Sequence, residues 1–219
     1  MNNTTENTAL DTVIWDFNGT LLDDLELTIQ TINQVLAENG VPPVDTHRHK
    51  STFRFPVIDY YRDIGLRTSD EAFSTVSERY HELYMSRVSE CSLYDGIPEV
   101  LAALEHRGTR QFVLSALNQT MLTSCIASLD LSDRFEAVYG LSDIMGRSKV
   151  VRGSELVRDF GIDPRRVLYI GDTNHDVEVA SELGFTAVAV SWGHQHARNF
   201  DSRVKAVANH PSEILSCLS

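Results

Sequence analysis

Residues 12–22 read TVIWDFNGTLL, and this stretch decides the fold class. Its first half, TVIWDF, is short, apolar and rich in β-branched residues, and it stops at the NGT of residues 18–20. That composition is typical of a buried strand that ends in a turn. The predicted strand therefore places the carboxylate of Asp16 at its carboxyl end.

From residue 94 onward, helices and strands alternate at short intervals. We expect helices over 98–106, 119–129, 148–160 and 174–183, and strands over 110–115, 135–140, 167–170 and 186–190. Such alternation predicts a parallel sheet covered by helices on both faces, which is a doubly wound, Rossmann-like α/β core. In sheets of this kind, the chemistry lies at the carboxyl ends of the strands.

An all-helical stretch interrupts this pattern directly after the first strand. Residues 23–39 repeat apolar side chains with helical spacing, and Gly40 ends the pattern. Residues 56–66 and 70–88 are predicted to be helical as well. We interpret the stretch as a helical cap inserted into the core, with these predicted boundaries: core 1–22 and 93–219, cap 23–92, hinges near 22–24 and 92–95.

The charge balance argues against a nucleic-acid partner. The 219 residues include 31 Asp and Glu against 19 Lys and Arg, so the formal net charge is −12. A chain this acidic has no general attraction for phosphate backbones, and an anionic substrate would need a local cation or a metal. The longest apolar runs have the length of strands, which predicts no membrane span.

The cysteines and the first residues predict a cytoplasmic location. Three cysteines (Cys91, Cys125 and Cys217) are widely spaced and form no CxxC pair, as expected of reduced thiols. The opening residues MNNTTENTALDT lack the basic and apolar regions of a signal peptide. The sequence leaves the oligomeric state open.

Polar and reactive groups follow four of the predicted strands and would converge in a doubly wound sheet. They are Asp16 to Thr20, Ser115 to Asn118, Lys149 after the third strand, and Gly171 to Asp176. Asp16 can attack phosphorus and form an acyl phosphate. Asp172 and Asp176 offer the hard oxygen ligands that Mg²⁺ prefers. This set predicts phosphoryl transfer.

Further groups at these strand ends suit a phosphate. Lys149 supplies a positive charge for the phosphoryl oxygens, and Thr20 and Ser115 can donate hydrogen bonds to them. Gly19 lets the backbone approach the phosphate closely.

The ordered set Asp-x-Asn-Gly-Thr-Leu, Ser, Lys and Gly-Asp-Thr-x-x-Asp resembles the haloacid dehalogenase superfamily. More narrowly, it is similar to the phosphoglycolate-phosphatase-like members, which carry a helical cap. The resemblance implies that Asp16 is the nucleophile and that Ser115 and Lys149 hold the phosphoryl group. It implies Mg²⁺ ligands at Asp16, Asn18 (through its backbone carbonyl), Asp172 and Asp176. The residues expected to bind the substrate are Asn18, Gly19, Thr20, Ser115, Ala116, Asn118 and Lys149.

One residue departs from the family pattern. Phosphatases of this superfamily carry an Asp two residues after the nucleophile as general acid and base, and this chain has Asn18. An amide cannot transfer that proton, and general acid–base catalysis contributes roughly 10²–10⁴-fold. Three interpretations stay open: a slower phosphatase that favours acyl or aryl phosphates, a phosphonate-type hydrolase with Lys50 as Schiff base, or a non-catalytic sensor that binds a phosphorylated metabolite.

We expect a Mg²⁺-dependent phosphatase that acts on a small phosphorylated metabolite through an aspartyl phosphate. Arg54 and Arg147 are further candidates to meet a substrate anion. The loop with His194 and His196 follows a strand and is a candidate to face the site, whereas His175 is read as a helix-start residue.

Overall fold

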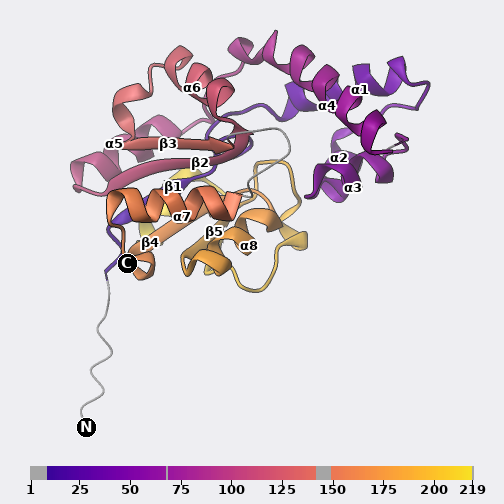
Figure 1. Cartoon of the computed structure of the whole chain (residues 1–219). Coiled ribbons are helices and arrows are strands. Elements are labelled where there is room, and N and C mark those ends of the chain that lie inside the picture. Colours follow the sequence, from indigo (N-terminus) through magenta and orange to yellow (C-terminus); the bar gives the residue numbers. More distant parts are fainter. Residues whose placement is uncertain (1–8, 68, 142–148, 219) are drawn as a thin grey trace.

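The computed structural model describes residues 9–67, 69–141 and 149–218 of the chain. Within them the strands form one parallel sheet of six, in the order β3-β2-β1-β4-β5-β6 (Figure 1). The strands are β1 Thr12–Trp15, β2 Arg110–Asn118, β3 Ala137–Leu141, β4 Val167–Gly171, β5 Thr186–Val190 and β6 Ala206–Ala208. The predicted doubly wound α/β class is confirmed, and the strand order reverses between β1 and β4.

Helices cover both faces of the sheet because successive residues of its strands point to opposite sides. Val13 and Trp15 of β1 belong to the core cluster under α5 and α6, and Ile14 belongs to the cluster under α7 and α8. The covering helices are α5 Ile97–His106, α6 Gln119–Ser128, α7 Lys149–Phe160 and α8 Asn174–Leu183. The central strands are therefore buried on both sides.

The helices between β1 and α5 in the sequence, which we call the cap, lie beside the sheet and have an apolar cluster of their own (Figure 1). Its helices are α1 Leu25–Glu38, α2 Thr46–Thr52, α3 Val57–Asp63 and α4 Asp70–Met85. The two connections to the sheet run side by side. The backbone N–H of Asp23 donates to the carbonyl of Ser92 (2.9 Å), and that of Tyr94 donates to the carbonyl of Leu21 (3.0 Å). We call these paired connections, residues 21–23 and 92–94, the hinge ribbon.

Some elements differ from the sequence prediction. The strand expected to end at Ser115 continues to Asn118, with a shift in its pairing to β3 between Leu114 and Asn118. Helix α2 was not predicted because its sequence, THRHKST, has no hydrophobic side chain with helical spacing. The short strand β6 was also unpredicted, as were the 3₁₀ helices in the described part of the chain: η1 Val88–Glu90, η2 Ser132–Arg134, η3 Pro164–Arg166, η4 Ala197–Asn199 and η5 Pro211–Ser216.

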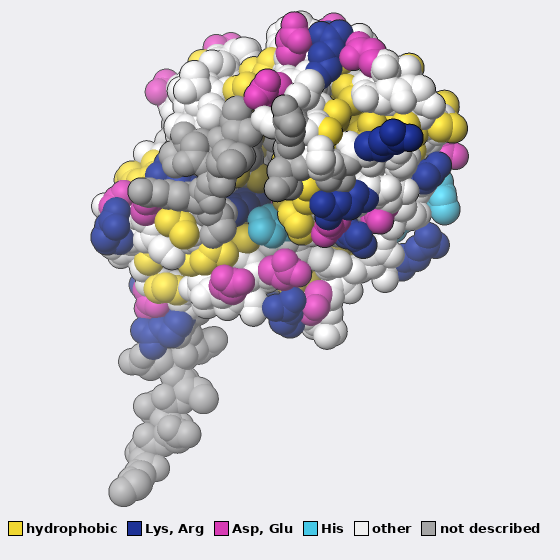
Figure 2. All heavy atoms as spheres, turned by 45° about the vertical axis from the view of Figure 1, so that its right-hand side comes forward, with side chains coloured by type: hydrophobic (Ala, Val, Ile, Leu, Met, Phe, Trp, Pro, Cys, Tyr) yellow, Lys and Arg dark blue, Asp and Glu magenta, His cyan; other side chains and the backbone are white. Residues whose placement is uncertain are grey.

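On the face in Figure 2, Lys and Arg side chains lie in small groups among acidic, hydrophobic and uncharged surface. Among the helices described, none has the length and hydrophobicity needed to cross a membrane.

Candidate active site

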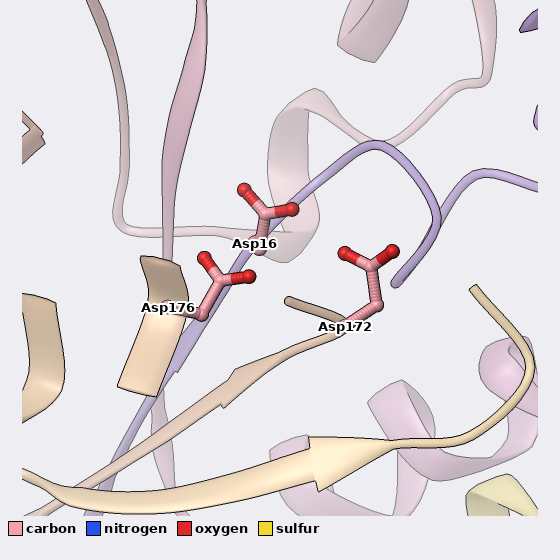
Figure 3. Close-up of side chains that lie close together, drawn as sticks. All are labelled: Asp16, Asp172 and Asp176. Atoms are coloured by element: carbon pink, nitrogen blue, oxygen red, sulfur yellow. The ribbon is translucent and has the colours of Figure 1, made fainter. Parts of the chain in front are cut away.

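Three carboxylates meet where the strand order reverses (Figure 3). Asp16 directly follows β1, Asp172 directly follows β4, and Asp176 lies in the first turn of α8. One oxygen from each lies within 4.8 Å of the others, and all three residues are buried. The predicted strand ends are thus brought together.

Lys149, the first residue of α7, lies between two of these carboxylates. Its buried ammonium donates to Asp16 Oδ1 and to Asp176 Oδ1, each at 2.6 Å. The other oxygen of Asp176 accepts from the hydroxyl (2.6 Å) and the backbone N–H (3.0 Å) of Thr173. Asp176 is therefore held on both oxygens, whereas Asp16 shares Lys149 with it.

Negative charge exceeds positive charge among these four residues. Burial, with the charges of Asp176 and Asp172, outweighs Lys149 and raises the pKa of Asp16 to about 8. Burial also raises the pKa of Asp172 to about 6, despite the nearby His194. Carboxylate oxygens with unbalanced charge suit a hard divalent cation. The donor set therefore fits Mg²⁺, with Asp16 and Asp172 the more available ligands.

A cavity of about 280 Å³ opens from this cluster. Asp16, Lys149, Ser115, Ala116 and Asn118 line it. The hydroxyl oxygen of Ser115 accepts from the backbone N–H of Leu117 (3.1 Å), and its own O–H can donate to a ligand. Asn118 also caps α6, where its side chain accepts from Thr120 N (2.9 Å). These five predicted residues therefore share one cavity with the predicted Asn18, Asp172 and Asp176.

Two glycines allow loops to pack against Asp172. Gly19 has φ +68°, and a Cβ on it would lie 2.4 Å from Asp172 Oδ2. A Cβ on Gly193 would lie 2.3 Å from the same oxygen. Thr20 is also beside Asp172 and donates to its Oδ1 at 3.3 Å. Gly19 and Thr20 do not line the cavity, so their predicted contact with a substrate stays a prediction.

Asn18 also lines the cavity, but its amide is engaged by the protein. Its Nδ2 donates to Asp24 Oδ2 (2.9 Å) and to the Tyr84 hydroxyl (2.7 Å). Asp24 Oδ1 also accepts from the backbone N–H of Gly19 at 2.8 Å. The Asn18 amide thus donates a hydrogen bond to the buried carboxylate of Asp24. An Asp at position 18 could do so only if its carboxyl group were protonated.

A chain of hydrogen bonds runs from Asp24 through two buried histidines at the junction of cap and sheet. His194 Nε2 contacts Asp24 Oδ1 (3.2 Å), and His194 Nδ1 contacts His49 Nε2 (3.1 Å). His49 Nδ1 in turn contacts the Tyr60 hydroxyl at 2.8 Å. We call this set the Asp24–His194 network; its members are Asn18, Asp24, His49, Tyr60, Tyr84 and His194.

The charge of each histidine in the network depends on its burial and on the charged group beside it. Burial disfavours an imidazolium, but the Asp24 carboxylate overcomes it and raises the pKa of His194 to about 9. Burial and the charge of His194 hold the pKa of His49 well below its usual range. A cationic His194 therefore donates to a neutral His49, which leaves His49 Nδ1–H to donate to Tyr60.

Sequence reasoning missed most of this network. The sequence predicts Asp24 only as part of a hinge near 22–24, and it singles out neither His49 nor Tyr84 as a site residue. The available signal was a carboxylate six residues after Asn18, which alone does not predict a partner at position 194.

Lys50 does not line the cavity. Its ammonium donates to the carbonyls of Ser191 (3.2 Å) and Trp192 (3.3 Å), which ties α2 to the loop after β5. A Schiff-base role for Lys50 gains no support from this placement.

The remaining candidates lie outside the carboxylate cluster. Arg54 is exposed and pairs with Asp63 at 2.9 Å. The ring of His175 stacks on Phe55, with centroids 4.6 Å apart, and His196 packs near His47. Arg147 lies outside the described residues. Of the four described candidates, His194 is the one that lines the cavity, and its backbone N–H donates to Asp172 Oδ2 at 2.6 Å.

Known proteins share both the sequence pattern and the fold. The chain is 27% identical over 207 residues to the phosphoglycolate phosphatase of Synechococcus elongatus, which covers 93% of this chain and 91% of that protein. It is 29% identical over 218 residues to the N-acetylmuramic acid 6-phosphate phosphatase of Pseudomonas aeruginosa, covering 95% of each. A haloacid dehalogenase-like family hydrolase from Streptococcus pneumoniae matches the structure with a TM-score of 0.82 at 21% identity, covering 96% of this chain and 99% of that one.

The family profile described as haloacid dehalogenase-like hydrolase matches residues 13–190. That span runs from β1 through the cap to the end of β5 and includes every carboxylate of the cluster. The predicted resemblance is confirmed: the chain belongs to the haloacid dehalogenase-like hydrolases.

Proposed function

We propose that this chain is a Mg²⁺-dependent phosphatase that hydrolyses a small phosphorylated metabolite through an aspartyl phosphate on Asp16. The observation that carries the proposal is the placement of Asp16 beside Asp172, Asp176 and Lys149 at the mouth of one cavity. The enzyme class, phosphoric monoester hydrolase, is that of the named phosphatase relatives.

In the first step, a carboxylate oxygen of Asp16 attacks phosphorus and the ester P–O bond breaks. The Lys149 ammonium and the Ser115 hydroxyl bind phosphoryl oxygens, with further donors from the backbone near Gly19, Thr20, Ala116 and Asn118. Mg²⁺ held by Asp16, Asp172 and the backbone carbonyl of Asn18, with Asp176 as ligand or as holder of a bound water, would neutralise charge on the phosphoryl group. The leaving oxygen takes its proton from water.

In the second step, water attacks phosphorus, phosphate leaves, and the Asp16 carboxylate is restored. Asn18 cannot take a proton from that water, because its amide has no basic site at neutral pH. The second step should therefore be slow. With p-nitrophenyl phosphate we expect a burst of one p-nitrophenol per chain, followed by slower turnover.

The test is hydrolysis of p-nitrophenyl phosphate and acetyl phosphate, with Mg²⁺ and with EDTA. Asp16→Ala is the blank for a contaminating phosphatase. Release that needs Mg²⁺ and disappears in the blank supports the proposal. Equal release from the blank, or none from either substrate, contradicts it and favours a sensor that binds without turnover.

The cytoplasmic location stays a prediction that rests on the cysteines. Cys91, Cys125 and Cys217 are unpaired in the structure.

A further inference from the structure

The cavity changes character away from the carboxylates. Its far end lies within the cap, and α1, α3, α4 and the segment between α2 and α3 line it. The side chains there are mainly rings and branched aliphatics: Ile32, Phe53, Val57, Tyr61, Phe73 and Tyr80. We call this part the aromatic end.

Several polar atoms near the aromatic end are already bonded within the protein. The Tyr80 hydroxyl donates to Thr28 Oγ1 at 3.3 Å. The Tyr84 hydroxyl donates to Asp24 Oδ2 at 2.7 Å, and the Tyr60 hydroxyl contacts His49. Ser77 and His81 of α4 also line this end, and His81 Nδ1 contacts the carbonyl of Ser77 at 2.8 Å. A ligand therefore meets mainly ring faces and edges there, with few polar groups for the hydroxyl groups of a sugar.

The described residues that line the cavity offer no further cation for a second anionic group. Among the described residues that line it, the positively charged side chains are Lys149 and His194. Lys149 is bonded to Asp16 and Asp176, and His194 to Asp24. Among the described residues, a carboxylate in the aromatic end would find no partner, and burying an unpaired carboxylate is strongly unfavourable.

Size is compatible with an aromatic ring. An apolar cavity of about 150 Å³ is enough to bind benzene. The cavity of about 280 Å³ therefore has room for one ring beyond the phosphate. On the face in Figure 2, hydrophobic side chains and a histidine lie next to each other near its centre.

We infer that the substrate is a phosphate monoester whose alcohol part is aromatic or otherwise apolar and carries no second charge. The inference rests on the proposed function for its reaction, but the lining of the aromatic end supports it independently. Asn18 also favours an aromatic alcohol part, because it cannot protonate the leaving group. A phenolate leaves without the protonation that an alkoxide needs. An aryl phosphate satisfies both features.

Binding of two non-hydrolysable phosphonates to the full chain with Mg²⁺ tests the inference. Benzylphosphonate carries a ring, and phosphonoacetate carries a carboxylate in the corresponding place. We expect calorimetry to show benzylphosphonate binding at least tenfold more tightly. Equal binding, or tighter binding of phosphonoacetate, overturns the inference.

Variants locate the preference within the cavity. Phe73 lines the aromatic end, whereas Leu83 packs against the same cap cluster without lining the cavity. Phe73→Ala should weaken benzylphosphonate at least fivefold and Phe73→Leu less, while Leu83→Ala should leave its affinity unchanged. Equal losses in Phe73→Ala and Leu83→Ala, or no loss in Phe73→Ala, count against the aromatic end.

Acetyl phosphate separates this inference from the proposed function. It has no group that fills the aromatic end, so its hydrolysis should be the same in Phe73→Ala as in the unchanged chain. A preference for benzylphosphonate without any hydrolysis keeps the inference about the ligand and removes the phosphatase. Hydrolysis without that preference keeps the phosphatase and removes the inference.

Discussion

The two ends of the cavity differ in how they are built. At the phosphate end, charged groups from distant strand ends hold one another through short hydrogen bonds, as Lys149 does with Asp16 and Asp176. At the aromatic end, rings from the inserted helices pack together, such as Tyr61 and Phe73 with centroids 5.8 Å apart. The residues that we propose to carry out the reaction and those that we propose to select the substrate therefore lie in separate parts of the chain. Each set should be open to change without the other.

The largest effect is expected from Asp16→Asn, which removes the nucleophile and keeps its shape. Hydrolysis of p-nitrophenyl phosphate should fall by at least about 10⁴-fold. Benzylphosphonate should still bind, since the aromatic end is unchanged and one negative charge is gone. Parallel rate and calorimetric measurements check this. Loss of both activity and binding would show that the two ends are not separable.

Lys149→Met tests how far the phosphate end depends on its cation. The change removes the cation that the buried Asp16 and Asp176 share, so the free energy of unfolding should fall by about 3 kcal/mol. The matched control is Arg79→Met, which breaks exposed ion pairs with Glu38 and Glu82 on the cap. That control should lose less than about 1 kcal/mol.

Urea unfolding of both variants, with and without Mg²⁺, provides the measurement. Mg²⁺ should restore part of the stability of Lys149→Met and none of that of Arg79→Met. Similar losses in the two variants would contradict the charge balance described for the cluster.

Asn18→Asp tests whether the general acid that is absent at position 18 can be restored. The single change places a carboxylate where the amide donates to Asp24 at 2.9 Å, so repulsion should limit its benefit. Asn18→Asp with Asp24→Asn reverses the donor and acceptor, and it should speed hydrolysis of alkyl phosphates by roughly 10²-fold. Aryl phosphates should gain much less.

The measurement is the rate of hydrolysis of one alkyl phosphate and one aryl phosphate by each variant. The variant with Asp24→Asn alone is the control. Equal gains for both esters would mean that protonation of the leaving group does not limit this enzyme.

The smallest effect is expected from Lys50→Met. Lys50 contacts backbone carbonyls of the loop after β5 rather than the cavity, so turnover of p-nitrophenyl phosphate should change less than about threefold, as for a surface substitution. Borohydride should trap no adduct of the unchanged chain with a keto-phosphonate. A trapped adduct that disappears in Lys50→Met would revive the phosphonate-type interpretation.

The phosphate end could be predicted because its residues follow strands, and strand ends converge in a parallel sheet. Asp16, Asp172 and Lys149 needed only the order of the strands to be brought together. The motif also carries its own local geometry, as in the Thr173–Asp176 cap of α8. These contacts join residues that are close in sequence or residues whose strands are neighbours in the sheet.

The aromatic end could not be predicted, because its position depends on how helices pack rather than on a strand register. Phe53 and Phe73 pack against the apolar cluster of the cap, and their local sequence does not show that they also line a cavity. The pairing of Asp24 with His194 joins residues 170 positions apart, and no local pattern announces it. Helix α2 carries His49 into that pairing and has no hydrophobic periodicity to reveal it.

The hinge ribbon has a consequence for how the cap can move. Its two connections are bonded to each other, from Asp23 to Ser92 and from Tyr94 to Leu21, and Leu22 pairs with Leu93 between them. Because the two connections are bonded to each other, neither can bend without the other. A displacement of the cap would therefore carry both connections, and the rings of the aromatic end with them, as one unit.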